Sequence, residues 1–382
     1  MDRSQFTEAQ RQFLVEVTGG YAFVPPRLPP EIELPRSLLL SDGDARAAVG
    51  ELVGQSRKIE ASLLIAPLRR REAVLSNVIE GTYTQVEDVL LGEATEGKRD
   101  TPAEAIEVLR TLDAIGLGQQ WLLEGRPLSV GMILELHALL LQSARGELRR
   151  PGEFRQKQVY LGAPGSALSA ARYVPPPWEQ VRPLTEDLIS FVGSGPVYGP
   201  LIDAALLHYQ FEAIHPFEDG NGRLGRALIS LYWLEQKLMP QPLLYLGAFF
   251  ARNRDVYIDR LAAVSRAGDW VPWIEFFVSA VVAEARDAVA RLRRIEELVS
   301  KYRARASAAS RSNVPIRAIE SVVDRVYVSV GDLMSETSTT APTAREAIRV
   351  LESIGLLRPG PRVQGKQYWV AAEVIDELYR LD

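Results

Sequence analysis

One segment of twelve residues concentrates the side chains of this sequence that could do chemistry. It reads His215-Pro-Phe-Glu-Asp-Gly-Asn-Gly-Arg-Leu-Gly-Arg226 and lies between two predicted helices. Because Gly220 and Gly222 lack side chains, main-chain N–H groups could approach an anion closely in this loop. The helix that follows would point its positive end at the same place, so a phosphate is the expected guest.

The polar side chains of the segment suit the transfer of a phosphorus-centred group. Arg223 and Arg226 lie three residues apart on one helix face, where their guanidinium groups could hold several phosphate oxygens. Asp219 offers a hard oxygen ligand for Mg²⁺ that arrives with a nucleoside triphosphate. His215 has an ordinary pKa near neutrality, which suits a general base. The set therefore predicts transfer from a nucleotide to a hydroxyl group.

The segment resembles the signature of Fic proteins, His-Pro-Phe-x-(Asp/Glu)-Gly-Asn-Gly-Arg-x-x-Arg, and it meets every specified position. The resemblance implies AMP transfer from ATP to Ser, Thr or Tyr hydroxyls of a target protein or of the chain itself, with release of pyrophosphate. Some relatives with an altered Gly-Asn-Gly-Arg stretch transfer phosphate or phosphocholine instead. The unaltered stretch in this chain favours AMP and leaves phosphate transfer as an alternative.

The resemblance also assigns roles within the segment. It implies that His215 deprotonates the attacking hydroxyl, that Phe217 anchors the loop and that Asp219 binds Mg²⁺ on the phosphates of ATP. Arg223 would hold the β-phosphate and Arg226 the γ-phosphate. The positions expected to bind ATP and its phosphates are Gly220, Asn221, Gly222, Arg223, Leu224, Gly225 and Arg226.

A second segment, Ser76-Asn-Val-Ile-Glu80-Gly81, suggests a built-in inhibitor. On a helix Ser76 and Glu80 are one turn apart and face the same way. The pattern resembles the inhibitory (Ser/Thr)-x-x-x-Glu-(Gly/Asn) helix of the family, in which the Glu pairs with the second Arg of the motif. We therefore expect Glu80 to occupy Arg226 and to compete with the γ-phosphate. Some relatives use this Glu to remove AMP, so de-AMPylation is a further alternative.

Two more segments correspond to functional parts of the family. The runs at 159–162 and 171–174 predict a hairpin, which corresponds to the flap on which a target protein adds its backbone as an extra strand. Asn253 and Tyr257 fall where relatives contact the adenine or ribose. His137 and His208 are expected to be packing residues, and the three histidines of the sequence have no zinc-ligand spacing.

The periodicity of apolar residues predicts a mainly α-helical protein. We expect an N-terminal helical region with a proline-rich strap and the inhibitory helix over 1–100. A Fic catalytic core with one β-hairpin flap would occupy 101–306. The order of three helices and a small hairpin predicts a winged helix-turn-helix over 307–382.

Composition limits the remaining functions. The 382 residues include no Cys and carry a net charge of −5, which excludes disulfides and argues against nonspecific coating of nucleic acid. Neither a secretory signal nor a membrane span is visible, so a cytoplasmic protein is expected.

The winged helix leaves a competing class open, namely a DNA-binding regulator whose Fic core only senses nucleotide. Residues 311–370 contain eight Lys/Arg against six acidic residues, a thin electrostatic footprint for DNA. A packing, dimerisation or target-recruiting unit is therefore favoured over DNA binding. Homodimerisation is known in relatives and stays an option here.

Overall fold

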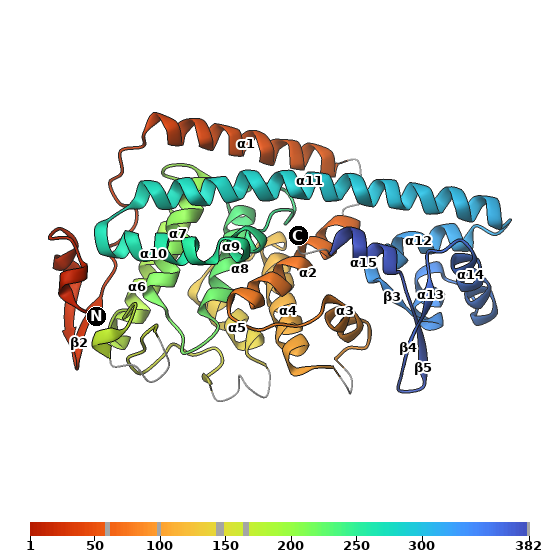
Figure 1. Ribbon diagram of the computed structural model, residues 1–382, viewed down its shortest axis with the longest axis horizontal. Helices are drawn as coiled ribbons and strands as arrows, with labels where there is room; N and C mark the ends of the chain where they lie inside the picture. Colours follow the sequence, from red (N-terminus) through yellow and green to blue (C-terminus); the bar gives the residue numbers. More distant parts are fainter. Residues whose placement is uncertain (58–61, 98–100, 143–148, 163–167, 380–382) are drawn as a thin grey trace.

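A computed structural model describes the chain over residues 1–57, 62–97, 101–142, 149–162 and 168–379. The fold is mainly α-helical, as the sequence predicts. Figure 1 shows two long helices side by side along one edge, with the other helices beneath them. Among the described residues, no helix combines the length and the apolar character that a bilayer crossing would need.

The described residues of the first part of the chain form a small hairpin, two short 3-10 helices and five α-helices. The short elements at the N-terminus are η1 (Arg3–Gln5), η2 (Gln10–Phe13), β1 (Leu14–Val17) and β2 (Gly20–Phe23). The helices are α1 (Arg36–Ser56), α2 (Ser62–Ile79), α3 (Val86–Ala94), α4 (Ala103–Leu123) and α5 (Val130–Leu140). Gly81 follows α2 with a φ of 86°, the left-handed conformation expected of a glycine that ends a helix.

Helix α2 differs from its prediction, because Pro67 lies inside it and does not end it. The sequence suggests separate helices over 59–66 and 68–80, the first of which begins outside the described residues. A proline removes one helical hydrogen bond, but α2 packs against α4 and α9, and this burial keeps the helix continuous. Ser76 therefore shares one rigid helix with the residues before Pro67.

The central part of the chain supplies the core. Its elements are η4 (Leu168–Ala170), η5 (Trp178–Gln180), α6 (Val181–Gly193), α7 (Pro200–Ile214), α8 (Asn221–Glu235), α9 (Gly247–Arg252), α10 (Arg254–Ala267) and α11 (Trp270–Ala309). Almost every residue of α7 and α8 is buried, because both helices are surrounded by others. Trp233 of α8 packs edge-on against Phe277 of α11, with ring centroids 6.3 Å apart. The loop between α7 and α8 is thus held by two immobilised helices.

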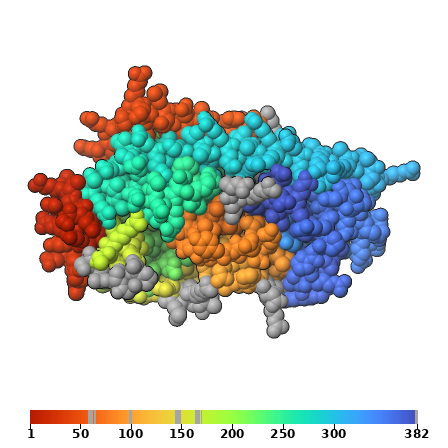
Figure 2. Space-filling model, viewed as in Figure 1, coloured from red at the N-terminus to blue at the C-terminus, as the bar shows by residue number. Residues whose placement is uncertain are grey.

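The C-terminal elements include three helices followed by a small hairpin, in the order that the sequence predicts. They are α12 (Val314–Arg325), β3 (Tyr327–Val328), α13 (Val330–Thr337), α14 (Ala341–Ser353), β4 (Arg358–Val363), β5 (Lys366–Val370) and α15 (Ala372–Leu378). The three strands form one antiparallel sheet in the order β3-β5-β4. Figure 2 shows this unit at one end of the molecule and the N-terminal hairpin at the other.

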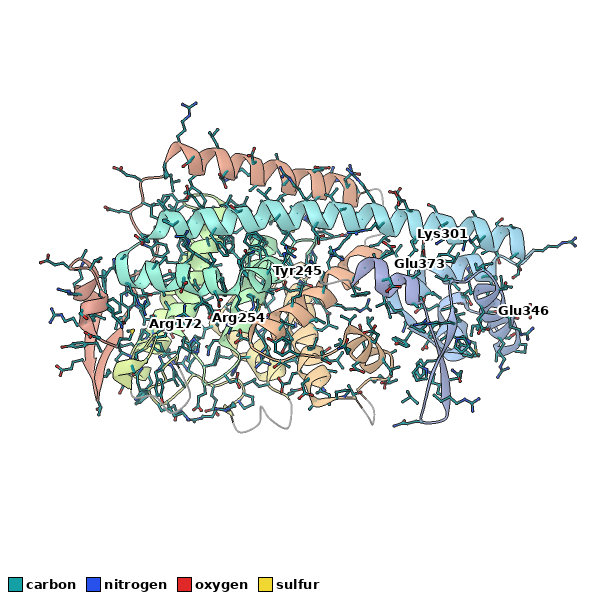
Figure 3. The ribbon with its side chains drawn as sticks, in the orientation of Figure 1. Arg172, Tyr245, Arg254, Lys301, Glu346 and Glu373 are labelled. Atoms are coloured by element: carbon teal, nitrogen blue, oxygen red, sulfur yellow. The ribbon has the colours of Figure 1, made fainter. Side chains whose placement is uncertain are left out.

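The small and basic residues after residue 300 suggest a linker, but α11 continues through them and ends at Ala309. Tyr302 is buried and donates a hydrogen bond to the carbonyl of Gly355 over 3.2 Å. Lys301 forms an ion pair with Glu373 of α15 at 2.5 Å, and Figure 3 labels both residues. The C-terminal unit from α12 to α15 therefore packs directly against α11.

The flap is reduced, within the described residues, to one antiparallel bridge between Leu161 and Tyr173. Two hydrogen bonds join their main chains, at 2.8 and 3.1 Å. The loop between them, from residue 163 to 167, lies outside the described residues. The hairpin β1–β2, which the sequence does not reveal, lies beside the flap, and Phe23 N–H donates to the carbonyl of Val174 over 2.9 Å.

Candidate active site

The loop between α7 and α8 is fixed by its own side chains. Asn221 is buried, accepts a hydrogen bond from Phe217 N–H and donates one to the Phe217 carbonyl, each over 2.9 Å. His137 of α5 stacks on Phe217 with ring centroids 3.6 Å apart. Gly220 has a φ of 79°, which only glycine adopts without strain. The side chain of Asn221 therefore holds the loop in shape. Because that side chain is already hydrogen-bonded to Phe217, only the main-chain N–H of Asn221 would be left to bind a phosphate.

His137 also holds the loop through its ring nitrogens. Nδ1 accepts a hydrogen bond from Gly152 N–H over 2.9 Å, so the proton of the neutral ring is on Nε2. Nε2 lies 3.1 Å from the carbonyl of Asp219 and donates to it. Burial lowers the pKa of His137 to about 4, which keeps this arrangement neutral. The packing role expected for His137 thus includes support of the motif.

His215 ends α7 in the left-handed conformation, with a φ of 49°. Its side chain is half-buried and lines a cavity of about 550 Å³ together with Gly222 and Arg226. Burial and the nearby Arg155 lower the pKa of His215 to about 4. The imidazole is therefore neutral at pH 7, as a proton acceptor must be.

Asp219 and Arg223 face each other across the first turn of α8. Asp219 Oδ1 accepts hydrogen bonds from Gly220 N–H over 2.6 Å and from Arg223 Nη2 over 3.3 Å. The Asp219 side chain is 45% exposed, so its second carboxylate oxygen can take a further ligand. Arg223 is almost fully buried, and its Nε has no hydrogen-bond partner in the described part of the chain.

The residues present fit a magnesium ion that is shared with a nucleotide. No cluster of three or more metal-ligating side chains occurs among the described residues. Mg²⁺ prefers six oxygen ligands and is commonly held by one or two carboxylates together with phosphate oxygens. Asp219 supplies one such carboxylate, beside an arginine with an unused N–H. The remaining ligands would come from the triphosphate and water.

The guanidinium group of Arg226 is hydrogen-bonded to Ser76 of α2 and to Glu80, the residue that follows α2. Its Nε donates to Ser76 Oγ over 2.8 Å, and its Nη2 donates to the Ser76 carbonyl over 2.8 Å and to Glu80 Oε1 over 2.6 Å. Although burial opposes ionisation, Arg226 lowers the pKa of Glu80. A Cβ built on Gly222 would come within 2.1 Å of Glu80 Oε1. The Glu80 carboxylate therefore lies directly over Gly222 in the first turn of α8.

The other expected ligands lie apart from the cavity or contribute differently. Leu224 is fully buried in the core, and its N–H is used by the Gly220 carbonyl. Gly225 packs against Glu212, whose Oε1 would meet a Cβ on Gly225 at 2.4 Å. Asn253 donates from its side chain to the Phe249 carbonyl over 2.9 Å and does not line the cavity. The side chains of Leu224 and Asn253 therefore do not line the cavity, and Gly225 has no side chain to contribute.

Tyr257 does line the cavity, but its hydroxyl is already bonded. His208 Nδ1 lies 3.1 Å from the Gly225 carbonyl and donates to it, so His208 Nε2 accepts from the Tyr257 hydroxyl over 2.7 Å. The ring of Tyr257 stacks on Phe250 with centroids 4.6 Å apart. Tyr257 therefore contributes its aromatic ring, which is packed against Phe250, to the lining of the cavity.

Three charged residues that line the cavity are absent from the sequence predictions. Glu212 lines the cavity, and its Oε1 has no hydrogen-bond partner in the described residues; burial raises the pKa of Glu212 to about 7. Arg172, beside the flap bridge, and Arg254, at the start of α10, also line the cavity and are labelled in Figure 3. The one available signal for Glu212 was its position, one helical turn before His215.

Family models match two segments of the chain. Residues 127–233 match the Fic/DOC family, and residues 40–120 match the Fic/DOC family N-terminal. "Protein adenylyltransferase fic-1" of Caenorhabditis elegans is 31% identical over 115 residues, which cover 30% of this chain and 20% of the relative. "Protein adenylyltransferase Fic" of Aedes aegypti is 28% identical over 220 residues, covering 57% of this chain and 37% of the relative. The chain thus matches well under half the length of either relative.

Solved structures share the fold. A Fic family protein from Desulfovibrio desulfuricans G20 superposes with a TM-score of 0.57 at 23% identity, covering 90% of this chain and 98% of that one. A Fic domain containing signaling protein from Bacteroides thetaiotaomicron VPI-5482 gives a TM-score of 0.53 at 19% identity, covering 67% of this chain and 97% of that one. Together these findings show that the chain contains a Fic/DOC family domain over residues 127–233, preceded by a Fic/DOC family N-terminal domain over residues 40–120.

Proposed function

We propose that this protein transfers AMP from ATP to a Ser, Thr or Tyr hydroxyl of a target protein, and that Glu80 restrains the transfer. The observation that carries the proposal is the cavity of about 550 Å³ that His215, with its lowered pKa, and Arg226 both line. The names of the matched relatives support the class of reaction.

The proposed reaction is an exchange at the α-phosphorus of ATP. The target hydroxyl oxygen forms a bond to this phosphorus while its proton passes to the free nitrogen of His215. The bond between the α-phosphorus and the bridging oxygen of the β-phosphate breaks, and pyrophosphate leaves with that electron pair. The negative charge of a bound triphosphate would raise the low pKa of His215 and strengthen it as a base.

The remaining residues would bind and orient ATP. Arg223 and the N–H groups at the start of α8 would hold phosphate oxygens. Asp219 would hold Mg²⁺, which when bound neutralises charge that develops on the leaving phosphates. The flap, with Leu161 39% exposed, would align the target backbone as an added strand.

The restraint follows from competition for one guanidinium group. Glu80 takes the Nη2 of Arg226, and Ser76 takes its Nε. A γ-phosphate that needs the same N–H groups would have to displace the carboxylate first. While Glu80 occupies Arg226, ATP would bind without this contact to its γ-phosphate, and its α-phosphate would not be held in line for the reaction.

Labelled ATP tests the proposal. The wild type and Glu80→Gly are incubated with Mg²⁺ and ATP carrying label on the α- or the γ-phosphate. Label from the α position alone on protein, stronger in Glu80→Gly, is the expected result. Protein label from the γ position would indicate phosphate transfer. Loss of AMP from a pre-modified protein without any transfer would indicate de-AMPylation.

A further inference from the structure

We infer that Arg155 is a positioning residue that holds His215 and the flap in one geometry; this rests on the proposed AMP transfer. Arg155 belongs to none of the elements that the sequence assigns to the site. It lies in the described segment between α5 and the flap, and it is 1% exposed. A guanidinium group so deeply buried must find polar partners, because a charge is costly to remove from water.

The partners of Arg155 are main-chain carbonyls of three separate segments. Nε donates to the His215 carbonyl over 2.9 Å, and Nη2 donates to the Ile214 carbonyl over 3.4 Å. Nη1 donates to the Lys157 carbonyl over 3.2 Å, before the first flap run, and Nη2 to the Pro176 carbonyl over 2.6 Å, after the second. The same residue therefore fixes the end of α7 and both ends of the flap.

The main chain of Arg155 adds a further link. Its own N–H donates to the carbonyl of Pro216 over 3.0 Å. Three consecutive carbonyls of the catalytic loop, from residue 214 to 216, thus accept from this one residue. His215 has a left-handed backbone, which a non-glycine residue keeps only when its surroundings enforce it. The hydrogen bonds from Arg155 to the carbonyls on and beside His215 hold the His215 backbone in this conformation.

The charge of Arg155 is not neutralised by an ion pair with any carboxylate of the described chain. Burial accordingly lowers the pKa of Arg155 to about 10. The guanidinium stays protonated at pH 7 and, after burial, contributes most to lowering the pKa of His215. Glu80 and Asp219 face the same imidazole and act in the opposite direction. Arg155 thus keeps the ring neutral as well as in place.

A flap that moved independently of His215 would present the target hydroxyl at a variable distance from the base. Misplacement of reacting groups by about 1 Å can reduce a rate roughly 10²-fold. Lysine cannot replace arginine here, because one ammonium group does not have the planar fork that reaches three segments.

The test uses Glu80→Gly as the parent and compares Arg155→Lys, Arg155→Met and Arg291→Met. Arg291 of α11 is the control, because it is also a buried arginine that donates to a main-chain carbonyl, that of Leu378, and it does not line the cavity; unlike Arg155 it also pairs with a carboxylate, that of Asp287. Transfer of α-label gives kcat and the KM for ATP. Nuclear magnetic resonance titration gives the pKa of His215, with His137 and His208 as internal references.

We expect Arg155→Lys and Arg155→Met to lower kcat roughly 10- to 100-fold, with the KM for ATP within about twofold of the parent. The pKa of His215 should rise in Arg155→Met and stay low in Arg155→Lys, which keeps the charge. Arg291→Met should match the parent in both. If Arg155→Met does not fold, the kcat of Arg155→Lys decides.

A kcat for Arg155→Lys within twofold of the parent overturns the inference, as does an unchanged His215 pKa in folded Arg155→Met. A parent that transfers no label refutes the proposed function instead. In that event the His215 titration still decides whether Arg155 governs the histidine.

Discussion

Arg226 of α8 donates a hydrogen bond over 2.6 Å to Glu80, the residue that follows α2, although the two positions lie 146 residues apart in the chain. The Arg226 side chain is 2% exposed and that of Glu80 is 40% exposed. The buried partner is therefore the one that a γ-phosphate needs, and the accessible partner is the one that can leave.

Removal of the Glu80 carboxylate should change nucleotide selectivity. In the wild type Arg226 is occupied, so ATP and ADP should bind with similar affinity. In Glu80→Gly the freed guanidinium should add about one charge-assisted contact to the γ-phosphate, and ATP should bind roughly tenfold tighter than ADP. Calorimetric titration of both nucleotides checks this, with the exposed residue Glu124→Gly as the control. Equal ATP and ADP affinities in Glu80→Gly would refute the competition.

Ser76→Ala should cost stability and release the restraint only in part. The substitution leaves the buried Nε of Arg226 without its 2.8 Å acceptor, which should lower the free energy of unfolding by about 1–3 kcal/mol. Glu80 would still hold Nη2, so AMP transfer should rise less than in Glu80→Gly. Urea unfolding gives the stability, and Ser279→Ala on the exposed face of α11 provides the control. A transfer rate equal to that of Glu80→Gly would contradict this division of roles.

Asp219→Asn should weaken the use of Mg²⁺ without opening the loop. An asparagine carbonyl can still accept from Gly220 N–H, whereas the negative charge that holds the cation is lost. Transfer by Glu80→Gly should fall roughly 10- to 100-fold when this change is added, and more Mg²⁺ should restore part of it. Asp376→Asn, an exposed change on α15, serves as the control. Unchanged dependence of the rate on Mg²⁺ would remove Asp219 from the metal site.

Much of the site could be predicted because its parts are local in sequence. The loop residues from His215 to Arg226 are contiguous, and the helical spacing of Ser76 and Glu80 places both on one face. The contact of these two residues with Arg226 is present in the fold. Whether this contact restrains the proposed AMP transfer stays a prediction.

The rest depends on contacts that the sequence does not display. Arg155 and Glu212 look like ordinary surface charges in the sequence, and only the packing of distant elements buries them. Asn253 occupies a loosely patterned segment, and its side chain bonds the end of α9 rather than the cavity. The hairpin β1–β2 is short and only half-buried, so its alternation of apolar residues is too weak to recognise.

The buried Glu72 predicts how stability depends on pH. Burial raises the pKa of Glu72 in the folded protein to about 7, from an ordinary value of 4.5. The folded state thus holds this proton more tightly, so the stabilisation is complete below pH 4.5 and is lost as the pH rises through about 7. Glu72→Gln keeps an acceptor for Gly247 N–H and removes the titration. The variant should be more stable than the wild type at pH 8 by about 1–3 kcal/mol.

Urea unfolding at pH 5 and pH 8 measures this difference. Glu124→Gln, an exposed change, should leave the pH dependence as it is in the wild type. A Glu72→Gln variant that is less stable at both pH values would show that the carboxylate is ionised and needed.

Intact-mass spectrometry after incubation with ATP and Mg²⁺ tests the central claim most directly. Three proteins are compared, namely the wild type, Glu80→Gly and Glu80→Gly with His215→Ala. We expect a mass increase of one adenylyl group or more on Glu80→Gly, little on the wild type and none on the double variant. An equal adduct on the double variant, or an unmodified Glu80→Gly protein with the wild type modified, would contradict a His215-dependent transfer restrained by Glu80.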